Sequence, residues 1–224
     1  MRVAVLQLRA DDSEPQASRI EHAAALVRAQ VGADLVVLPE LWVPGAFAYH
    51  GYDESASALP GPAVSAIAAA ARDISAHVVA GTFVEDDAGR RHNTAVLLSP
   101  RGDISHTYRK VHLFGFDSGE ATTLAAGDDV AVGVIDGVRF GMTTCYDLRF
   151  PELYRIFVDQ GAELFIIPTG WPTRRLAHWQ VLTRARAIEN QVFLIGCNQV
   201  GVQEGVEMAG HSVVIDPWGQ VLAE

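Results

Sequence analysis

Short apolar runs alternate with segments of helical periodicity along this chain, and no other feature restricts its fold as much. Each run is rich in Val, Ile or Leu and is bounded by Pro, Gly or polar residues, which is typical of a buried strand. An alternation of this kind predicts an α/β protein whose sheets are covered by helices. The predicted strands are residues 3–8, 35–38, 78–84, 93–98, 106–114, 130–135, 138–144, 164–167, 192–197 and 211–216.

Helical periodicity is clear between these runs. Ile20, Ala24, Val27 and Val31 fall on one face of a predicted first helix, with Asp12 or Ser13 as its cap. Further helices are predicted to begin near Pro62 and Pro151 and to cover residues 176–190.

Composition narrows the class of protein. The 224 residues are 49% hydrophobic and show no internal division, so we expect one domain over residues 1–224. A net charge of −10 argues against a nucleic-acid or anionic-membrane partner. Two cysteines make no disulfide framework, and no secretory leader or membrane span is apparent, so a cytoplasmic location is expected.

Cys145 lies where the predicted strand 138–144 meets a helix beginning at Pro151-Glu152. A side chain at such a corner projects beyond the sheet edge, and backbone N–H groups at the helix start can receive negative charge. A thiolate nucleophile would be useful there. The plainer alternative is a buried thiol that only packs, and a lowered pKa with sensitivity to alkylation would exclude it.

Three charged residues also stand at breaks in the apolar pattern. Glu40 follows the run 35–38, Lys110 lies in the alternating segment 106–114, and Glu120 lies in a Gly-, Ser- and Thr-rich loop that we expect to be flexible. Each alone could be an ordinary surface charge. Together with Cys145 they could perform acyl chemistry, with Glu40 as base and Lys110 and the N–H of Tyr146 as donors to an oxyanion.

Other catalytic arrangements find less support. A papain-like Cys/His pair would use His112, His178 or His211 as base, but no cysteine-protease signature surrounds Cys145. The serine-hydrolase elbow, the dinucleotide-binding and P-loop motifs, His-Glu-x-x-His and Cys-x-x-Cys are all missing. No metal and no cofactor are therefore expected.

Several motifs, in order along nearly the whole chain, resemble those of the nitrilase superfamily of carbon–nitrogen hydrolases. They are Leu38-Pro39-Glu40-Leu41, Tyr108-Arg109-Lys110-Val111-His112, Gly119-Glu120, Cys145-Tyr146-Asp147-Leu148-Arg149-Phe150-Pro151-Glu152, Pro168-Thr169-Gly170-Trp171-Pro172, His178-Trp179, Arg184-Ala185-Arg186-Ala187-Ile188-Glu189-Asn190 and His211 to Gly219.

That resemblance implies an αββα sandwich that commonly dimerises into a four-layer αββααββα core. It also implies catalytic roles: Glu40 as general base, Lys110 as oxyanion-stabilising cation, Cys145 as nucleophile and Glu120 as a second carboxylate that positions Lys110 and substrate. Family members usually continue beyond Trp218-Gly219 with a further strand and extension, which would be short or missing here.

The Cys145 motif is most similar to the branch of omega-amidases and deaminated glutathione amidases. We therefore expect a metal-free amidase acting on a small carboxamide, with ω-amides of dicarboxylic acids favoured. An N-carbamoyl amidohydrolase with the same four residues is the alternative, and a catalytically idle binding member is less favoured. Tyr146, Arg149, Thr169 and Trp171 are the predicted oxyanion and substrate-binding residues. Arg149, Arg174 and Arg175 could each grip a substrate carboxylate or serve in a structural ion pair.

Overall fold

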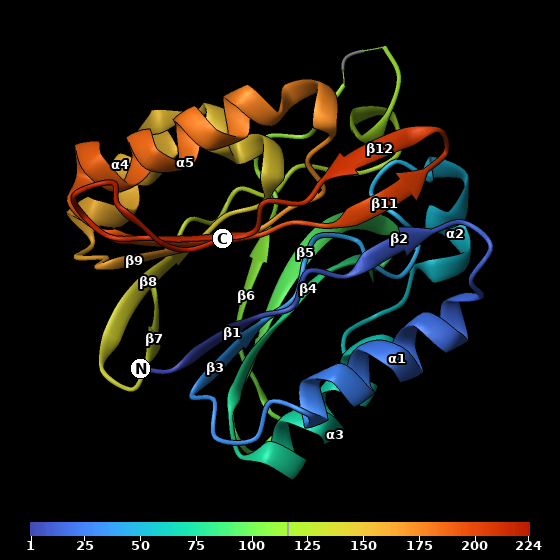
Figure 1. Ribbon diagram of the computed structural model, residues 1–224. Coiled ribbons are helices and arrows are strands. Elements are labelled where there is room, and N and C mark those ends of the chain that lie inside the picture. The colour runs from blue at the N-terminus through green and yellow to red at the C-terminus, as the bar shows by residue number, and fades with distance from the viewer. Residues whose placement is uncertain (116) are drawn as a thin grey trace.

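Two β-sheets pack face to face, and a layer of helices covers each outer face (Figure 1). The structure is a computed structural model that describes residues 1–115 and 117–224. This is the αββα sandwich that the sequence predicts. No helix in the described residues is both long and apolar enough to cross a membrane.

The first sheet has the strand order β1-β3-β4-β5-β6. β1, β3 and β4 are parallel, and β4, β5 and β6 are antiparallel neighbours. Its helices, α1 (Gln16–Arg28) and α3 (Pro62–Ile74), pack together on one face. The strands are β1 (Val3–Val5), β3 (Leu35–Val37), β4 (His77–Asp87), β5 (Arg90–Leu98) and β6 (Ile104–Arg109).

The second sheet has the order β14-β13-β10-β9-β8-β7 and is covered by α4 (Pro151–Asp159) and α5 (Leu176–Asn190). β8, β9 and β10 are parallel neighbours. Its strands are β7 (Gly133–Ile135), β8 (Val138–Met142), β9 (Leu164–Pro168), β10 (Phe193–Cys197), β13 (Val213–Ile215) and β14 (Val221–Ala223).

Helices cover one face of each sheet and the other sheet covers its second face. The strands therefore carry apolar side chains on both faces. In β3, Leu35 and Val37 face the other sheet, whereas Val36 packs with the helices. The alternate positions of β9 divide in the same way, with Ile166 between the sheets and Phe165 under α4. The buried core between the sheets includes Leu35, Val37, Val79, Leu97, Tyr108, Phe140, Met142, Ile166, Ile195 and Cys197.

A small third sheet was not predicted. β2 (Arg9–Asp11), β11 (Val200–Gln203) and β12 (Val206–Ala209) form it in the order β12-β11-β2. The predicted strand 3–8 is wrong in its extent, because β1 ends at Val5 and the chain then joins this sheet as β2. Residues 200–209 lack a continuous apolar run, so the pairing of β11 with β12 was not recognisable in the sequence.

Details of the first helix also differ from expectation, and two connecting segments contain short helical turns. Val31 lies beyond the end of α1 and is exposed, and neither Asp12 nor Ser13 caps the helix, since Pro15 is at its N-cap. Residues 46–58 contain a 3₁₀ turn, η1 (Tyr49–Gly51), and α2 (Tyr52–Ser55). The predicted loop 115–127 contains the 3₁₀ turn η2 (Glu120–Thr122), and its residue Phe116 lies outside the described residues.

The core between the sheets should dominate stability. We predict that Val79→Ala lowers the free energy of unfolding by about 2 kcal/mol, because two methyl groups leave a fully buried site and a cavity remains. Val134→Ala, the same change in β7 at a side chain that is 58% exposed, should cost less than about 0.5 kcal/mol. Urea unfolding monitored by circular dichroism compares the two. Equal effects would contradict the assignment of this core.

Candidate active site

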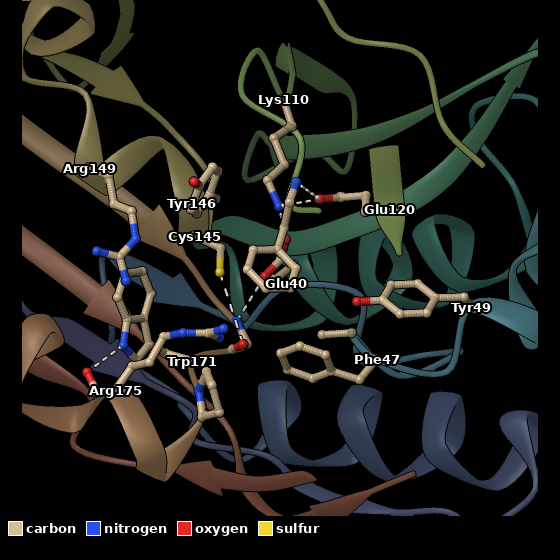
Figure 2. A pocket seen from close by; sticks show the side chains of 14 residues that line it. Glu40, Phe47, Tyr49, Lys110, Glu120, Cys145, Tyr146, Arg149, Trp171 and Arg175 are labelled. Carbon is tan, nitrogen blue, oxygen red and sulfur yellow. Dashed lines mark hydrogen bonds and ion pairs between the residues drawn. The ribbon is translucent and has the colours of Figure 1, made fainter. Parts of the chain in front are cut away.

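Residues from both sheets meet at one end of the sandwich. Glu40 lies three residues after the end of β3, Lys110 directly follows β6, and Cys145 comes shortly after β8. Because these strand ends lie at the same edge, side chains 105 positions apart in the sequence reach one another. Figure 2 shows Glu40, Lys110, Glu120 and Cys145 gathered in this way. The predicted grouping of these four residues is present in the structure.

Cys145 occupies the predicted corner between strand and helix. It begins the 3₁₀ turn η3 (Cys145–Arg149), which leads through Phe150 into α4. Its φ of 46° is in the left-handed region, which is strained for a residue with a side chain by about 1–3 kcal/mol. The neighbouring N–H of Tyr146 makes no backbone hydrogen bond to other described residues outside this turn. The corner thus presents a thiol and an available donor together.

Lys110 bridges two buried carboxylates. Its Nζ lies 2.8 Å from Glu40 Oε1 and 2.7 Å from Glu120 Oε2, and all three side chains are almost wholly inaccessible to solvent. Burial alone would lower the pKa of Lys110, but Glu120 and Glu40 outweigh that effect and hold it well above its ordinary value. The ammonium therefore stays charged, and two of its three N–H groups are engaged.

Glu120 is held more firmly than the sequence suggested. A flexible loop carboxylate was expected, but the side chain is buried and accepts hydrogen bonds from Lys110 Nζ and from the N–H of Phe114 at 2.9 Å. Burial is the main reason that the pKa of Glu120 is raised. Glu120 is therefore not the ordinary surface charge that loop composition alone allowed, because composition does not reveal whether tertiary contacts enclose a side chain.

The thiol of Cys145 is not activated in the resting structure. Burial raises its pKa, the charge of Glu40 raises it further, and Lys110 opposes both. A thiol whose pKa is raised must give its proton to a base when it reacts. Gly170 brings such a base close. Its N–H donates to Glu40 Oε2 at 2.9 Å, and its carbonyl oxygen lies 3.9 Å from Cys145 Sγ.

Two residues that the sequence did not single out connect the site. Asp147, fully buried in η3, accepts hydrogen bonds from the Tyr108 hydroxyl at 2.7 Å and from the N–H of His112 at 2.9 Å. It thereby ties the Cys145 corner to the segment that carries Lys110. Asn93 on β5 donates to both glutamates. Polar residues inside an apolar strand, such as Asn93, are the signal that could have revealed it.

A cavity of about 400 Å³, including its open mouth, lies over the thiol. This is within the range of small-molecule sites. Apolar and aromatic residues form most of its wall, and two arginines complete it. The lining residues are Glu40, Ala46, Phe47, Tyr49, Lys110, Phe114, Glu120, Cys145, Tyr146, Arg149, Gly170, Trp171, Pro172 and Arg175.

The two arginines of the cavity carry no ion pair within the described part of the chain. The guanidinium of Arg149 lies over the rings of Tyr146 and Trp171, with carbon-to-centroid distances of 5.7 and 5.0 Å. That of Arg175 lies 4.9 Å from the centroid of Phe114. Burial, Arg174 and Arg149 lower the pKa of Arg175. Two unneutralised cations beside the thiol make the cavity a favourable place for an anion.

Other predicted residues lie outside the cavity lining. Thr169 is fully buried, and the exposed Arg174 lines an adjoining surface hollow together with Phe47, Tyr49 and Phe114. The three candidate histidines are occupied at other places. His112 binds Asp147, His178 lies 3.1 Å from Arg149 Nη2, and His211 contacts Glu224. Since none of the three lines the cavity, the papain-like alternative has no base near Cys145.

Comparisons with known proteins agree with this geometry. The family model described as carbon-nitrogen hydrolase matches residues 2–224. The 2-oxoglutaramate amidase of Paenarthrobacter nicotinovorans is 43% identical, over 99% of this chain and 78% of its own length. The omega-amidase NIT2 of Mus musculus is 34% identical, over 100% of this chain and 83% of its own.

A solved structure is similar throughout as well. It is the amidase from Nesterenkonia sp. AN1, a nitrilase-superfamily protein, in a mutant form with the acetamide moiety of fluoroacetamide added covalently at the active-site cysteine. It superposes with a TM-score of 0.83 at 29% identity, covering 99% of this chain and 84% of its own. The matching family model, the sandwich fold and the cluster of Glu40, Lys110 and Cys145 agree with one another. The chain therefore belongs to the carbon-nitrogen hydrolase family.

Proposed function

We propose that this protein is a cysteine-dependent amidase that hydrolyses the ω-amide of a small dicarboxylic acid and releases ammonia. The observation that carries the proposal is the buried Glu40–Lys110–Glu120 cluster beside Cys145, at the base of a cavity whose wall holds two unpaired arginines. The relatives named as omega-amidase and 2-oxoglutaramate amidase support the same class of substrate.

The first half of the reaction forms a thioester. Glu40 takes the thiol proton as Cys145 Sγ attacks the amide carbon, and the carbonyl oxygen becomes an oxyanion. The third N–H of Lys110 and the N–H of Tyr146 are the donors available to that oxygen. Glu40 then returns the proton to the nitrogen, the carbon–nitrogen bond breaks, and ammonia leaves.

The second half reverses these roles with water. Glu40 accepts a proton from a water molecule whose oxygen attacks the thioester carbon, and the same donors hold the oxyanion. The carbon–sulfur bond breaks, the sulfur recovers its proton, and the carboxylic acid is released. Glu120 stays bound to Lys110 throughout and keeps the ammonium directed into the site.

The arginines support a substrate that carries a carboxylate. In Figure 2, Arg149 and Arg175 lie on the side of Cys145 away from Glu120, so a substrate can place its amide at the thiol and its acid near them. A guanidinium binds a carboxylate through two parallel hydrogen bonds. A neutral aliphatic amide would leave both cations without a partner in a partly desolvated wall.

The active-site assignment is tested first at the two cysteines. Cys145→Ser should abolish ammonia release from ω-amides, whereas Cys197→Ser should retain activity within a few-fold. Cys197 is fully buried between the sheets, and its Sγ lies 3.3 Å from the carbonyl oxygens of Leu6 and Val37. Circular dichroism verifies that both variants fold. Comparable loss of turnover in a folded Cys197→Ser protein would refute the assignment of Cys145 as nucleophile.

Substitutions of Arg175 and Arg174, which are adjacent in the sequence, test the class of substrate. Arg175→Gln should raise KM for an ω-amide of a dicarboxylic acid by about tenfold or more and leave KM for a neutral aliphatic amide nearly unchanged, because a charge-assisted hydrogen bond is worth about 1.5–3 kcal/mol. Arg174→Gln is the matched control, since Arg174 does not line the cavity. If N-carbamoyl amino acids are the better substrates of the wild type, with carbon dioxide released beside ammonia, the carbamoyl alternative is correct.

We further propose that two copies associate through the α4 and α5 face, as the family resemblance implies. On the outer side of α5, Val181 and Ile188 are 64% and 51% exposed, and Ile156 of α4 is also exposed. The turn at Gly219 packs against Ile188, beside the exposed Trp218. α4 and α5 form the outer layer on their side of the sandwich, with the other sheet on the far side (Figure 1).

This association predicts a measurable mass. Light scattering should give about twice the 24.1 kDa chain mass for the wild type, and Val181→Glu should shift the protein toward the single-chain mass because a charge would be buried in the interface. Val31→Glu, the same change at an exposed residue remote from these helices, should leave the mass unchanged. A wild type that stays at the single-chain mass at high concentration would disprove the proposal.

We also propose that residues 1–224 act as one domain in a reducing, cytoplasmic compartment. Lining residues of the cavity follow strands of both sheets, which supports a single domain. Both cysteines are free thiols, one of them the proposed nucleophile, and oxidation would inactivate it.

A further inference from the structure

Asn93 makes several contacts with the active-site cluster, although the proposed mechanism gives it no role. It lies on β5, opposite Val84 of β4, and its side chain is fully buried. Its Nδ2 donates to Glu40 Oε1 at 2.9 Å and to Glu120 Oε1 at 2.6 Å. The amide therefore bridges the two carboxylates. On Glu120 it binds Oε1, whereas Lys110 binds Oε2.

The orientation of the Asn93 amide follows from charge. If the amide were reversed, its oxygen would face two carboxylate oxygens at hydrogen-bonding distance and repel both. In the observed orientation Oδ1 is buried with no hydrogen-bond partner among the described residues. An unsatisfied buried acceptor destabilises a fold, so it persists only where the other half of the group is strongly bound. Two charge-assisted hydrogen bonds to Nδ2 provide that.

The backbone of Asn93 also supports the cation. Its carbonyl oxygen accepts a hydrogen bond from the N–H of Lys110 at 2.8 Å, directly after the last paired residue of β6. One residue thus holds Lys110 through its main chain and both glutamates through its side chain. The distances among Lys110, Glu40 and Glu120 consequently depend on one residue of the first sheet, Asn93.

We infer that Asn93 is a positioning residue that holds Glu40 and Glu120 apart and in register, so that Glu40 Oε2 faces Cys145 and Glu120 Oε2 faces Lys110. This role rests on the proposed function of the cluster. An amide suits it because Nδ2 offers two donors and no exchangeable charge, so it stabilises both carboxylates without competing with Glu40 for the thiol proton. Lysine or arginine in its place would neutralise the base.

Loss of the amide should change proton transfer in a definite direction. The groups that face the carboxylates are Lys110, Cys145, Tyr49 and Tyr52. Lys110 is the cation among them, so without Nδ2 it is the one remaining group that binds both glutamates, while the N–H groups of Phe114 and Gly170 each bind one. Removing a donor from ionised carboxylates favours their protonated form, so a base in this cluster would be ready only at higher pH.

The test measures alkylation of Cys145 by iodoacetamide between pH 5 and pH 9 in wild type, Asn93→Ala and Asn93→Asp, with steady-state hydrolysis of an ω-amide measured beside it. Asn93→Asp keeps the size of the side chain and replaces its donors by acceptors. Asn190→Ala is the matched control. Asn190 is also a buried asparagine with an unpaired Oδ1, but its Nδ2 binds only the carbonyl oxygen of Arg186 in α5. Mass spectrometry assigns the alkylated cysteine, and circular dichroism verifies folding.

We expect the acid limb of the alkylation profile to move up by about one pH unit in Asn93→Ala, as loss of a charge-assisted hydrogen bond implies. kcat should fall by about 10²-fold with KM within a few-fold, since misplacement of reacting groups acts on the chemical step. Asn93→Asp should be affected more strongly, because a third acid joins the cluster. Asn190→Ala should keep the wild-type profile.

Other outcomes would contradict the positioning role of Asn93. An unchanged profile and kcat in a folded Asn93→Ala or Asn93→Asp protein would show that Asn93 only fills space, and an equal shift in Asn190→Ala would show a general loss of stability. Alkylation does not depend on which amide is the substrate. If the wild type hydrolyses no ω-amide but Asn93→Ala still shifts the alkylation profile, the positioning role holds and the proposed substrate class fails.

Discussion

The ammonium of Lys110 between Glu40 and Glu120 is the interaction on which the rest of this site depends. Two carboxylates cannot be buried together as anions unless a cation and several hydrogen bonds compensate them. Lys110 Nζ binds both, Asn93 donates to both, and the N–H groups of Phe114 and Gly170 take one carboxylate each. This network holds two carboxylates and a charged oxyanion donor beside a thiol in a buried site.

The sandwich explains how such a network can be held. Glu40 and Lys110 follow strands of the first sheet, whereas Cys145 and Gly170 follow strands of the second. A largely apolar layer packs the two sheets together. Asp147 adds a polar tie between the Cys145 corner and the segment carrying Lys110. The left-handed backbone at Cys145 and at Leu41, next to Glu40, is strain that this rigid surrounding maintains.

The cavity divides into two regions of opposite charge. The carboxylates lie on one side of the thiol, and Arg149 and Arg175 lie on the other, each over an aromatic ring. Stacking leaves guanidinium N–H groups free while it fixes the planes of the two groups. A substrate with an amide at one end and an acid at the other matches this division. The same arrangement explains why a protein with a net charge of −10 can attract an anion.

The sequence by itself determined the fold class and singled out Glu40, Lys110, Glu120 and Cys145. Strands that are apolar on both faces require a covered sheet on each side, and the order of the motifs around Glu40, Lys110, Glu120 and Cys145 identifies the family. Local pattern also located the corner at Cys145, because an apolar run stops there and Pro151 starts a helix.

Only the tertiary structure decided how those residues are poised. Burial and the charge of Glu40 raise the pKa of Cys145, tertiary contacts enclose Glu120, and neither property can be read from composition. Asn93 sits in an apolar strand far from the other site residues in sequence, so its two contacts exist only after the sheets assemble. The β2-β11-β12 sheet arises from pairing between segments about 190 residues apart, which no local pattern encodes. Periodicity along the chain specifies which face is buried, whereas the partners of a buried polar group are set by contacts distant in sequence.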